Sequence, residues 1–291
     1  MDSMEKTTLA ESEVEEKTQW HNAFFVAIQA QLIDYKDALI YENEHPLTTE
    51  PLRIDVLVIK KRPETVVKKQ IAEIFRLNNH FEYKNPGDSL SVSEFHKSLA
   101  RVHLYKSFTN DVEIDGMTLS FVVAVHPRDL FKYLREILGY TVEERYPGVF
   151  VVTGEMIPIQ IINSAKLSED ENLWLRNLNQ NLTEENLRWI HDKKREYGDR
   201  IDLSAYLYAV LNASHQAIKE IFSKEGNKML TAELSKTLEE IGLGAQWRQE
   251  GKIEVARNLL GMNMPIDQIV TATGLTREEV ESERHRITVV Q

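Results

Sequence analysis

The chain contains no cysteine, which excludes disulfide bonds and thiolate metal sites and fits a reducing compartment. Long apolar runs are also missing, because the longest, such as residues 121–125, are far too short to cross a bilayer. The N-terminus lacks the basic and apolar pattern of a signal peptide. These absences predict a cytoplasmic protein without a membrane partner.

Positive charge is scarce as well. The formal net charge is −11, whereas attraction to phosphates normally supplies most of the non-specific affinity for nucleic acid. The charge is uneven, however. Residues 1–50 carry three lysines against eleven acidic residues, and residues 51–110 carry eleven basic residues against six acidic ones. This local excess of basic residues is compatible with a DNA-facing cleft, although surface helices also show such a bias by chance.

At 291 residues, with 42% apolar and 28% charged residues, the chain is long enough for one sizeable core and a smaller helical part. Apolar, strand-like runs stop after Ile162, and helical periodicity dominates from Glu169. We therefore expect an acidic lead-in over residues 1–16, an α/β domain over 17–165 and a helical region over 166–291.

Apolar periodicity and turn residues give the expected order of elements in the α/β part. Ser91 and Glu94 form the sequence pattern of a capping box, which marks the start of a helix. The predicted elements are a helix over 17–36, strands starting at 39 and spanning 52–60, a helix within 64–78, a short strand ending at Pro86, a helix over 89–108, a strand over 118–126, a helix from Pro127 to Gly139, a hairpin of 140–146 and 149–153, and a strand over 157–162.

An aspartate interrupts an otherwise apolar run, Ile54-Asp55-Val56-Leu57-Val58-Ile59, where an unpaired carboxylate would be costly. The next predicted strand carries Glu82-Tyr83-Lys84. Side chains alternate along a strand, so Glu82 and Lys84 project from the same face. If the two strands are neighbours, two carboxylates and an ammonium converge. Such an arrangement is suited to hold a hard divalent cation and a nucleophilic water against a phosphodiester.

This spacing alone is weak evidence, because an aspartate followed at a distance by Glu-x-Lys occurs by chance in acidic chains. In the simpler interpretation, Asp55 is a strand-end carboxylate, and Glu82 and Lys84 form a solvated surface pair. Two features favour a site: the apolar context of Asp55, and the passage from strand to helix that follows Lys84.

The block of Asp55 and Glu82-Tyr83-Lys84 resembles the PD-(D/E)XK nuclease superfamily. Within it, most of residues 17–285 is similar to the bacterial recombination-promoting nuclease, or putative transposase, family. The segments that carry the resemblance are Trp20–Phe24, Ile54–Lys61, Ile74–Arg76, Glu82–Asp88, Gln160–Ile162, Leu173–Leu175 and Gly251–Leu260.

The resemblance implies a restriction-endonuclease-like mixed sheet flanked by helices, and a Mg²⁺-dependent endodeoxyribonuclease with DNA as its partner. Asp55 and Glu82 would bind Mg²⁺, or Mn²⁺ in its place, because hard cations select carboxylate oxygen. The backbone carbonyl of Tyr83 would add a third ligand, as in the superfamily. Lys84 would orient or help deprotonate the attacking water and stabilise the charge that develops on phosphorus.

Three further residues are candidates near this site. Lys97 and Arg101 lie one turn apart on the predicted helix over 89–108, either as DNA-phosphate contacts or as part of a solvated face. His21 stands on the first predicted helix, which the resemblance places near the active site in a supporting role. The acidic residue that many superfamily members carry on that helix has no clear counterpart here; Glu16 or Gln29 could take its place, or none.

The C-terminal residues 264–270 and 273–280 read as two short helices across a glycine turn, a helix-turn-helix pattern. The second of them is rich in glutamate, which suits packing or homo-oligomer formation better than reading a major groove. Two classes of function therefore remain: an active nuclease, or a catalytically silent nuclease-fold protein with a binding or regulatory role. The intact set of Asp55, Glu82 and Lys84 favours the first.

Overall fold

The structure, a computed structural model, describes residues 19–42, 57–180, 182–223 and 228–290. It comprises two compact units, one ending at Lys219 and the other beginning at Glu220. The first is built on a mixed β-sheet with helices on its faces, and the second is helical. The predicted fold class, a mixed α/β core flanked by helices with a helical C-terminal region, is confirmed.

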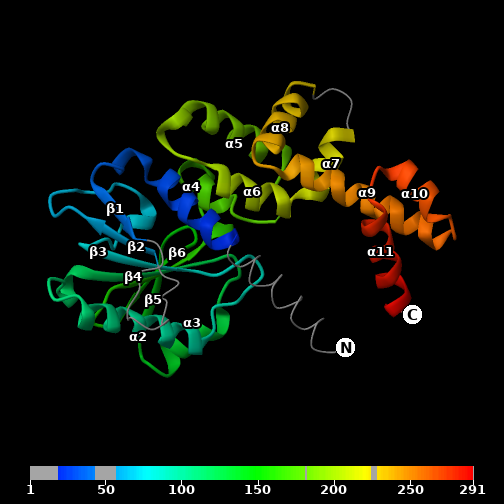
Figure 1. Ribbon diagram of the computed structural model, residues 1–291. Coiled ribbons are helices and arrows are strands. Elements are labelled where there is room, and N and C mark those ends of the chain that lie inside the picture. Colours follow the sequence, from blue (N-terminus) through cyan, green and yellow to red (C-terminus); the bar gives the residue numbers. More distant parts are fainter. Residues whose placement is uncertain (1–18, 43–56, 181, 224–227, 291) are drawn as a thin grey trace. The chain divides into compact units, whose positions relative to one another are not determined.

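A seven-stranded sheet forms the centre of the first unit, in the order β1-β2-β3-β4-β7-β6-β5 (Figure 1). Strands β3, β4 and β7 are parallel to one another, whereas the outer pairs β1–β2, β2–β3, β7–β6 and β6–β5 are antiparallel. The strands are β1 Leu39–Glu42, β2 Leu57–Lys61, β3 Asn78–Tyr83, β4 Met117–Val123, β5 Thr141–Tyr146, β6 Val149–Thr153 and β7 Ile159–Asn163.

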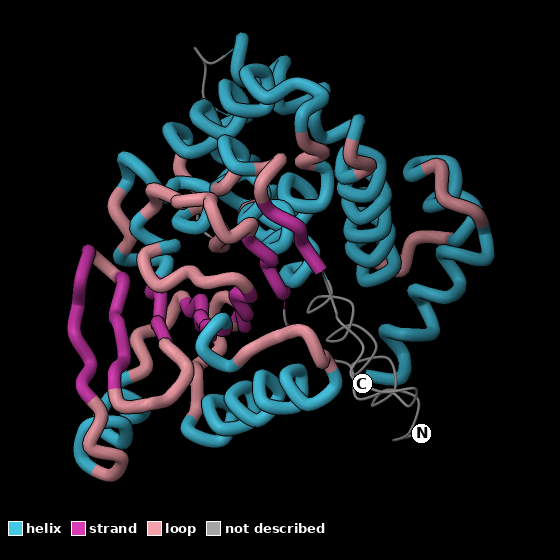
Figure 2. The backbone as a smooth tube through the Cα atoms, turned by 90° about the vertical axis from the view of Figure 1, so that its left-hand side faces the viewer, coloured by secondary structure: helices cyan, strands magenta, loops and turns pink. Residues whose placement is uncertain are grey.

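Helices cover both faces of this sheet (Figures 1 and 2). One face carries α2 and α3, and the other carries the helix of residues 19–31 together with α4, α5 and α6. The helices of this part of the chain are α2 Val92–Phe108, α3 Arg128–Glu136, α4 Glu169–Arg176, α5 Glu184–Tyr197, α6 Ser204–Ala213 and α7 His215–Ser223.

The three parallel strands are buried along their whole length, as expected for strands covered on both faces. Phe24 of the N-terminal helix stacks on Tyr83 of β3, with 4.7 Å between ring centroids. On the opposite face, Phe95 of α2 stacks on Phe121 of β4 at 5.6 Å. Successive side chains of β3 therefore meet different helices, and Glu82 points toward α2.

Helix α2 connects the parallel strands β3 and β4, and its start follows from the local sequence. The Ser91 hydroxyl accepts a hydrogen bond from the backbone N–H of Glu94, and the Glu94 carboxylate accepts one from the backbone N–H of Ser91. This is the predicted capping box. Phe95 and Val102 are buried and Leu99 is partly buried, so the predicted apolar face is the one that packs on the sheet.

The helix predicted within residues 64–78 is wrong. Only a short 3₁₀ turn, Gln70–Ala72, forms there. The carbonyl of Ile71, in the middle of this turn, accepts a hydrogen bond from the buried Gln160 side chain at 2.7 Å. The Asn79 side chain accepts a hydrogen bond from the Arg76 N–H and donates one to the Arg76 carbonyl. A side chain of the following strand, Asn79, and one of a distant strand, Gln160, thus satisfy backbone groups that a helix would have satisfied internally.

The later elements of the sheet lie close to their predicted places. Pro127 precedes the first residue of α3, and Gly139 takes a left-handed conformation (φ +69°) after it. Gly148 turns the β5–β6 hairpin, also with positive φ, and a Cβ there would lie 2.7 Å from the carbonyl oxygen of Asn163. This turn therefore needs glycine both for its backbone conformation and for space.

Beyond β7 the described elements are all helical, but the compact unit does not end with the strands. Helices α4 to α6 share an aromatic cluster, in which Trp174 packs edge-on against Trp189 and Tyr206. The Tyr206 hydroxyl donates to the carbonyl of Trp174 at 3.2 Å. The unit that contains the sheet therefore extends to Lys219, past the change in secondary structure near residue 165.

The second unit ends in three helices packed round a small apolar core of Ala256, Ile269, Leu275 and Val280. Gly274, with φ +68°, separates the last two helices, which form where the helix-turn-helix pattern predicted them. The helices of this unit are α8 Lys228–Glu240, α9 Leu243–Gly261, α10 Ile266–Thr273 and α11 Arg277–Val290. Within the described parts of both units, no helix combines the length and apolarity needed to cross a membrane.

Candidate active site

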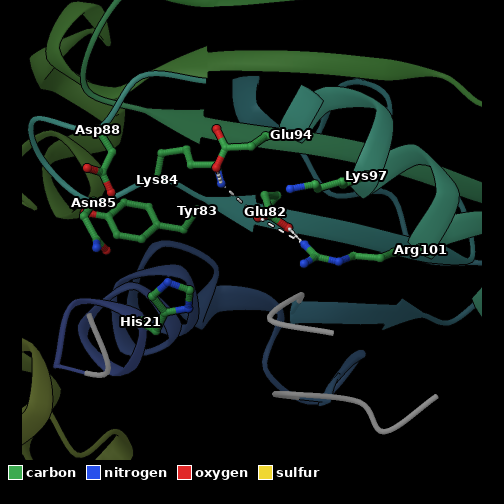
Figure 3. A pocket seen from close by; sticks show the side chains of 9 residues that line it. All are labelled: His21, Glu82, Tyr83, Lys84, Asn85, Asp88, Glu94, Lys97 and Arg101. Carbon is green, nitrogen blue, oxygen red and sulfur yellow. Dashed lines mark hydrogen bonds and ion pairs between the residues drawn. The ribbon is translucent and has the colours of Figure 1, made fainter. Parts of the chain in front are cut away.

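A pocket of about 220 Å³ opens at the C-terminal end of β3, where the strand leads toward α2 (Figure 3). Every predicted site residue that falls within the described ranges lines it. The lining residues are His21, Glu82, Tyr83, Lys84, Asn85, Asp88, Glu94, Lys97 and Arg101.

Glu82 is the buried carboxylate of this pocket, with only 3% of the residue exposed. Its Oε1 lies 3.3 Å from Lys84 Nζ, and its Oε2 lies 3.2 Å from Arg101 Nη1. A buried charge needs such partners, because desolvation of an unpaired carboxylate is expensive. The same-face placement of Glu82 and Lys84 that strand alternation predicted is therefore present, and Arg101 joins them from α2.

Lys84 lies between two carboxylates. Its Nζ is 2.7 Å from Glu94 Oε1, closer than it is to Glu82. Burial alone would raise the pKa of Glu94, but hydrogen bonds from Lys84 and Ser91 outweigh it and hold the pKa below its usual value. Glu94 thus caps α2 with one carboxylate oxygen and fixes the Lys84 ammonium with the other.

Tyr83 points to the other face of the sheet, toward the helix of residues 19–31. His21 meets its ring edge-on, with 6.2 Å between centroids, and both residues border the pocket (Figure 3). The Tyr83 hydroxyl is buried and has no hydrogen-bond partner within the described part of the chain. Burial raises the pKa of this phenol well above its usual value, so it stays neutral.

The two predicted phosphate-binding residues differ in their surroundings. Arg101 is half-buried and occupied by Glu82. Lys97 is exposed on the preceding turn of α2 and points over Glu82 (Figure 3); it has no ion-pair partner among the residues that the structure describes. Lys97 is therefore the cation of this pocket that is available to an anionic ligand without breaking an existing pair.

Asp55, the remaining member of the predicted triad, lies outside the described residues. The described part of β2 begins at Leu57, which pairs with Phe81 of β3. The described part of the strand predicted over residues 52–60, which was expected to include Asp55, is therefore the direct neighbour of the strand that carries Glu82.

Within the described ranges, no group of three His, Cys, Asp or Glu side chains could hold a metal ion. Glu82, Asp88 and Glu94 all border the pocket, but Glu94 is engaged by Lys84 and by the α2 cap. A site for a hard cation here would need Glu82 together with oxygen ligands from elsewhere in the chain.

Three pocket residues were not among those predicted from the sequence: Glu94, Asn85 and Asp88. The capping-box pattern pointed to Glu94 but gave no sign of its contact with Lys84. Asn85 and Asp88 lie in the Asn-Pro-Gly-Asp turn after β3, and the Asn85 Oδ1 is buried with no hydrogen-bond partner in the described structure. A polar turn directly after a buried strand that bears charged residues was the available signal.

A larger pocket, of about 720 Å³, lies among α4, α5 and the residues that follow β4 and β7. Its arginine, Arg176, is already bound by the carbonyls of Ala165 and Leu167 and by Glu169. Glu185 adds a second carboxylate, so the lining does not suit a phosphate. The predicted site residues that are described line the smaller pocket.

Comparison with known proteins adds no relative: no protein-family model, curated protein or solved structure matches this chain.

Proposed function

We propose that this protein is a metal-dependent endodeoxyribonuclease that hydrolyses DNA phosphodiester bonds, of the PD-(D/E)XK type that its sequence resembles. The observation that carries the proposal is the buried Glu82 carboxylate, 3.3 Å from Lys84, at the mouth of a pocket that also holds Lys97 and Arg101. A buried acid and a fixed ammonium in an open pocket are costly for stability, and such arrangements cluster at functional sites.

In this proposal Asp55, Glu82 and the backbone carbonyl of Tyr83 hold Mg²⁺ or Mn²⁺. The donor set is all oxygen, which is the set that these hard cations prefer. When bound, the cation would supply charge neutralisation and a more acidic water. Arg101 is paired with Glu82 in the structure. To contact DNA, it has to leave that carboxylate and pair with a phosphate oxygen when the cation and the DNA bind. Lys97 can contact phosphate from the outset.

In this proposal Lys84 stabilises the negative charge that develops on the phosphoryl oxygens in the transition state. Its ammonium lies between Glu82 and Glu94, and two carboxylate partners suit a hydrogen-bond donor better than a base. As the water oxygen attacks phosphorus and the bond to the leaving sugar oxygen breaks, Lys84 donates a hydrogen bond to the extra negative charge on the phosphoryl oxygens. Glu94 keeps the ammonium in place.

The proposed metal site sets a condition on strand register. Residues opposite one another in an antiparallel pair share a face, and β2 pairs with β3 as Leu57 with Phe81. An unchanged register before Leu57 would match position 55 with Tyr83, whose side chain is on the wrong face. Asp55 can join Glu82 only if the register shifts by one residue, as at a β-bulge.

The test is incubation of the pure full-length protein with supercoiled plasmid, with Mg²⁺, with Mn²⁺ and with EDTA. Nicking that needs either cation and is lost in Asp55→Asn and Glu82→Gln supports the proposal. Lys132→Ala serves as a control, because Lys132 is an exposed lysine of α3 outside the pocket. Activity that survives both carboxylate substitutions would place the nuclease elsewhere, or in a contaminant.

A second candidate is a catalytically silent nuclease-fold protein that binds DNA or regulates another protein. One observation favours it: both oxygens of Glu82 are engaged, by Lys84 and by Arg101, and the described residues contain no group of three His, Cys, Asp or Glu side chains that could hold a metal ion. If the wild-type protein binds DNA but cuts nothing with either cation, this candidate replaces the first.

A further inference from the structure

Two large apolar side chains stay exposed on the flank of α2 that carries the pocket cations. Leu104 is 40% exposed and Phe108 is 56% exposed. Together with Lys97 and Arg101 they fall at positions i, i+4, i+7 and i+11, so the four residues form one stripe along the helix. We call this stripe the α2 track. It starts at the pocket, which Lys97 and Arg101 line, and ends at the last residue of α2.

The sheet beside the track is also uncovered and amphipathic. Lys60 of β2 interacts with Tyr105 of α2 and with Glu42 of β1, so it lies on the sheet face that α2 covers. Ile40 of β1 is opposite Lys60 in the strand register, shares that face, and is 63% exposed. The edge of the sheet therefore extends beyond the cover of α2 and adds one more exposed apolar side chain, next to the Lys60–Glu42 ion pair.

The order of basic and aromatic side chains along the α2 track indicates which kind of ligand it binds. The pocket end of the track carries Lys97, which has no ion-pair partner among the described residues, and Arg101, which is paired with Glu82; the far end carries an aromatic ring. Cations that follow a phosphate backbone, with aromatic faces for the bases, are how proteins hold single-stranded nucleic acid. A duplex keeps its base faces stacked inside and offers Phe108 nothing to stack on.

We propose that the α2 track binds a single strand of nucleic acid that runs into the active-site pocket, with phosphates on Lys97 and Arg101 and a base stacked on Phe108. Seven residues separate Arg101 from Phe108, about 10 Å along the helix axis, so neighbouring nucleotides of one strand can reach both. This proposal rests on the proposed nuclease function and names the substrate class of the same site: single-stranded DNA, or a duplex end that has frayed.

The test measures binding of the full-length protein to a fluorescent 20-nucleotide oligothymidine and to the matching duplex, by anisotropy, in EDTA so that no DNA is cut. The wild-type protein binds the single strand more tightly than the duplex. Phe108→Ala weakens binding of the single strand by about 5- to 100-fold with little change in salt dependence, and Phe108→Trp retains it. Lys97→Ala lowers the slope of log affinity against log salt by about 1.

The control is Ile137→Ala. Ile137 is 69% exposed at the end of α3, which packs on β5 at the sheet edge opposite β1. The Ile137→Ala variant loses an apolar side chain of similar kind at a site away from the α2 track, and we expect it to bind the single strand as the wild-type protein does.

Three results would overturn the proposed track. The first is equal binding of single strand and duplex, both insensitive to Phe108→Ala. The second is a wild-type protein that associates with itself and becomes monomeric in Phe108→Ala, which would assign the apolar end to a second copy. The third is loss of binding in Ile137→Ala as well. Metal-dependent nicking of plasmid by the wild-type protein would leave the nuclease proposal standing in each case. Absence of both nicking and DNA binding would remove the two proposals together.

Discussion

Glu94 places Lys84: the lysine Nζ lies 2.7 Å from one oxygen of the Glu94 carboxylate, while the other oxygen accepts a hydrogen bond from the backbone N–H of Ser91. The first turn of α2 and the end of β3 are therefore joined through one side chain. If the Lys84 ammonium acts as proposed, its position matters at the level of about 1 Å, and Glu94 fixes that position from the helix cap. The strand-to-helix passage thus contributes directly to the geometry of the site.

Lys84→Ala removes the group proposed to stabilise the transition-state charge. We expect plasmid nicking to fall by about 10²- to 10³-fold, because deleting one preorganised donor typically costs that much. Affinity for Mn²⁺, measured by calorimetry, should stay near that of the wild type, since Lys84 is not a ligand. Equal nicking rates for Lys84→Ala and the wild type would show that any activity arises elsewhere.

Glu94→Gln separates the two roles of Glu94. Glutamine can still cap the helix, but it no longer pairs with Lys84 as an anion, so we expect a lower nicking rate with α2 intact by circular dichroism. Stability gives a second readout. The folded-state pKa of Glu94 is lowered, so its stabilising effect is present above the ordinary value of 4.5 and is lost as pH falls through the folded-state pKa.

The melting temperature of Glu94→Gln should therefore fall below that of the wild type at neutral pH, and the gap should close under acid conditions. Glu136→Gln, an exposed carboxylate of α3, is the control. A gap that persists unchanged well below pH 4.5 would contradict the assigned role of the Glu94 charge.

Local signals account for what the sequence predicted. The α2 start follows from Ser91 and Glu94, three residues apart, and the shared face of Glu82 and Lys84 follows from strand alternation. Both need only neighbouring residues. The pairing of Arg101 with Glu82 was not predictable, because it depends on how α2 runs back over β3. The failed helix before β3 has the same cause, since Gln160 binds backbone 89 positions away.

Glu82→Ala tests the charge balance of the pocket. Two carboxylates that share a metal site repel one another in the metal-free protein, and removal of one of them can then raise stability. In the structure Glu82 is instead the shared anion of Lys84 and Arg101. We therefore expect Glu82→Ala to lower the free energy of unfolding by about 1–3 kcal/mol, because the partly buried Arg101 loses its ion-pair partner and Lys84 keeps only Glu94.

Chemical denaturation of Glu82→Ala and of the double variant Glu82→Ala with Arg101→Ala measures this balance. Removal of Arg101 as well should recover part of the loss, since the cation that Glu82→Ala leaves unpaired is then gone. A more stable Glu82→Ala would mean that repulsion among carboxylates dominates after all, and would favour a close approach of Asp55 in the metal-free protein.

The strand register at Asp55 can be read by disulfide formation, because the chain has no cysteine of its own. With the register of Leu57 and Phe81 continued unchanged, position 56 lies opposite position 82; with a one-residue shift, position 55 does. We compare two double variants, Asp55→Cys with Glu82→Cys and Val56→Cys with Glu82→Cys, under mild oxidation.

A disulfide needs Cβ atoms about 3.5–4.5 Å apart, which only residues facing one another can reach. The nuclease proposal predicts faster cross-linking of the Asp55 pair, seen as a mobility shift that dithiothreitol reverses. Preferential cross-linking of the Val56 pair would put Asp55 on the far face of the sheet and exclude it as a partner of Glu82.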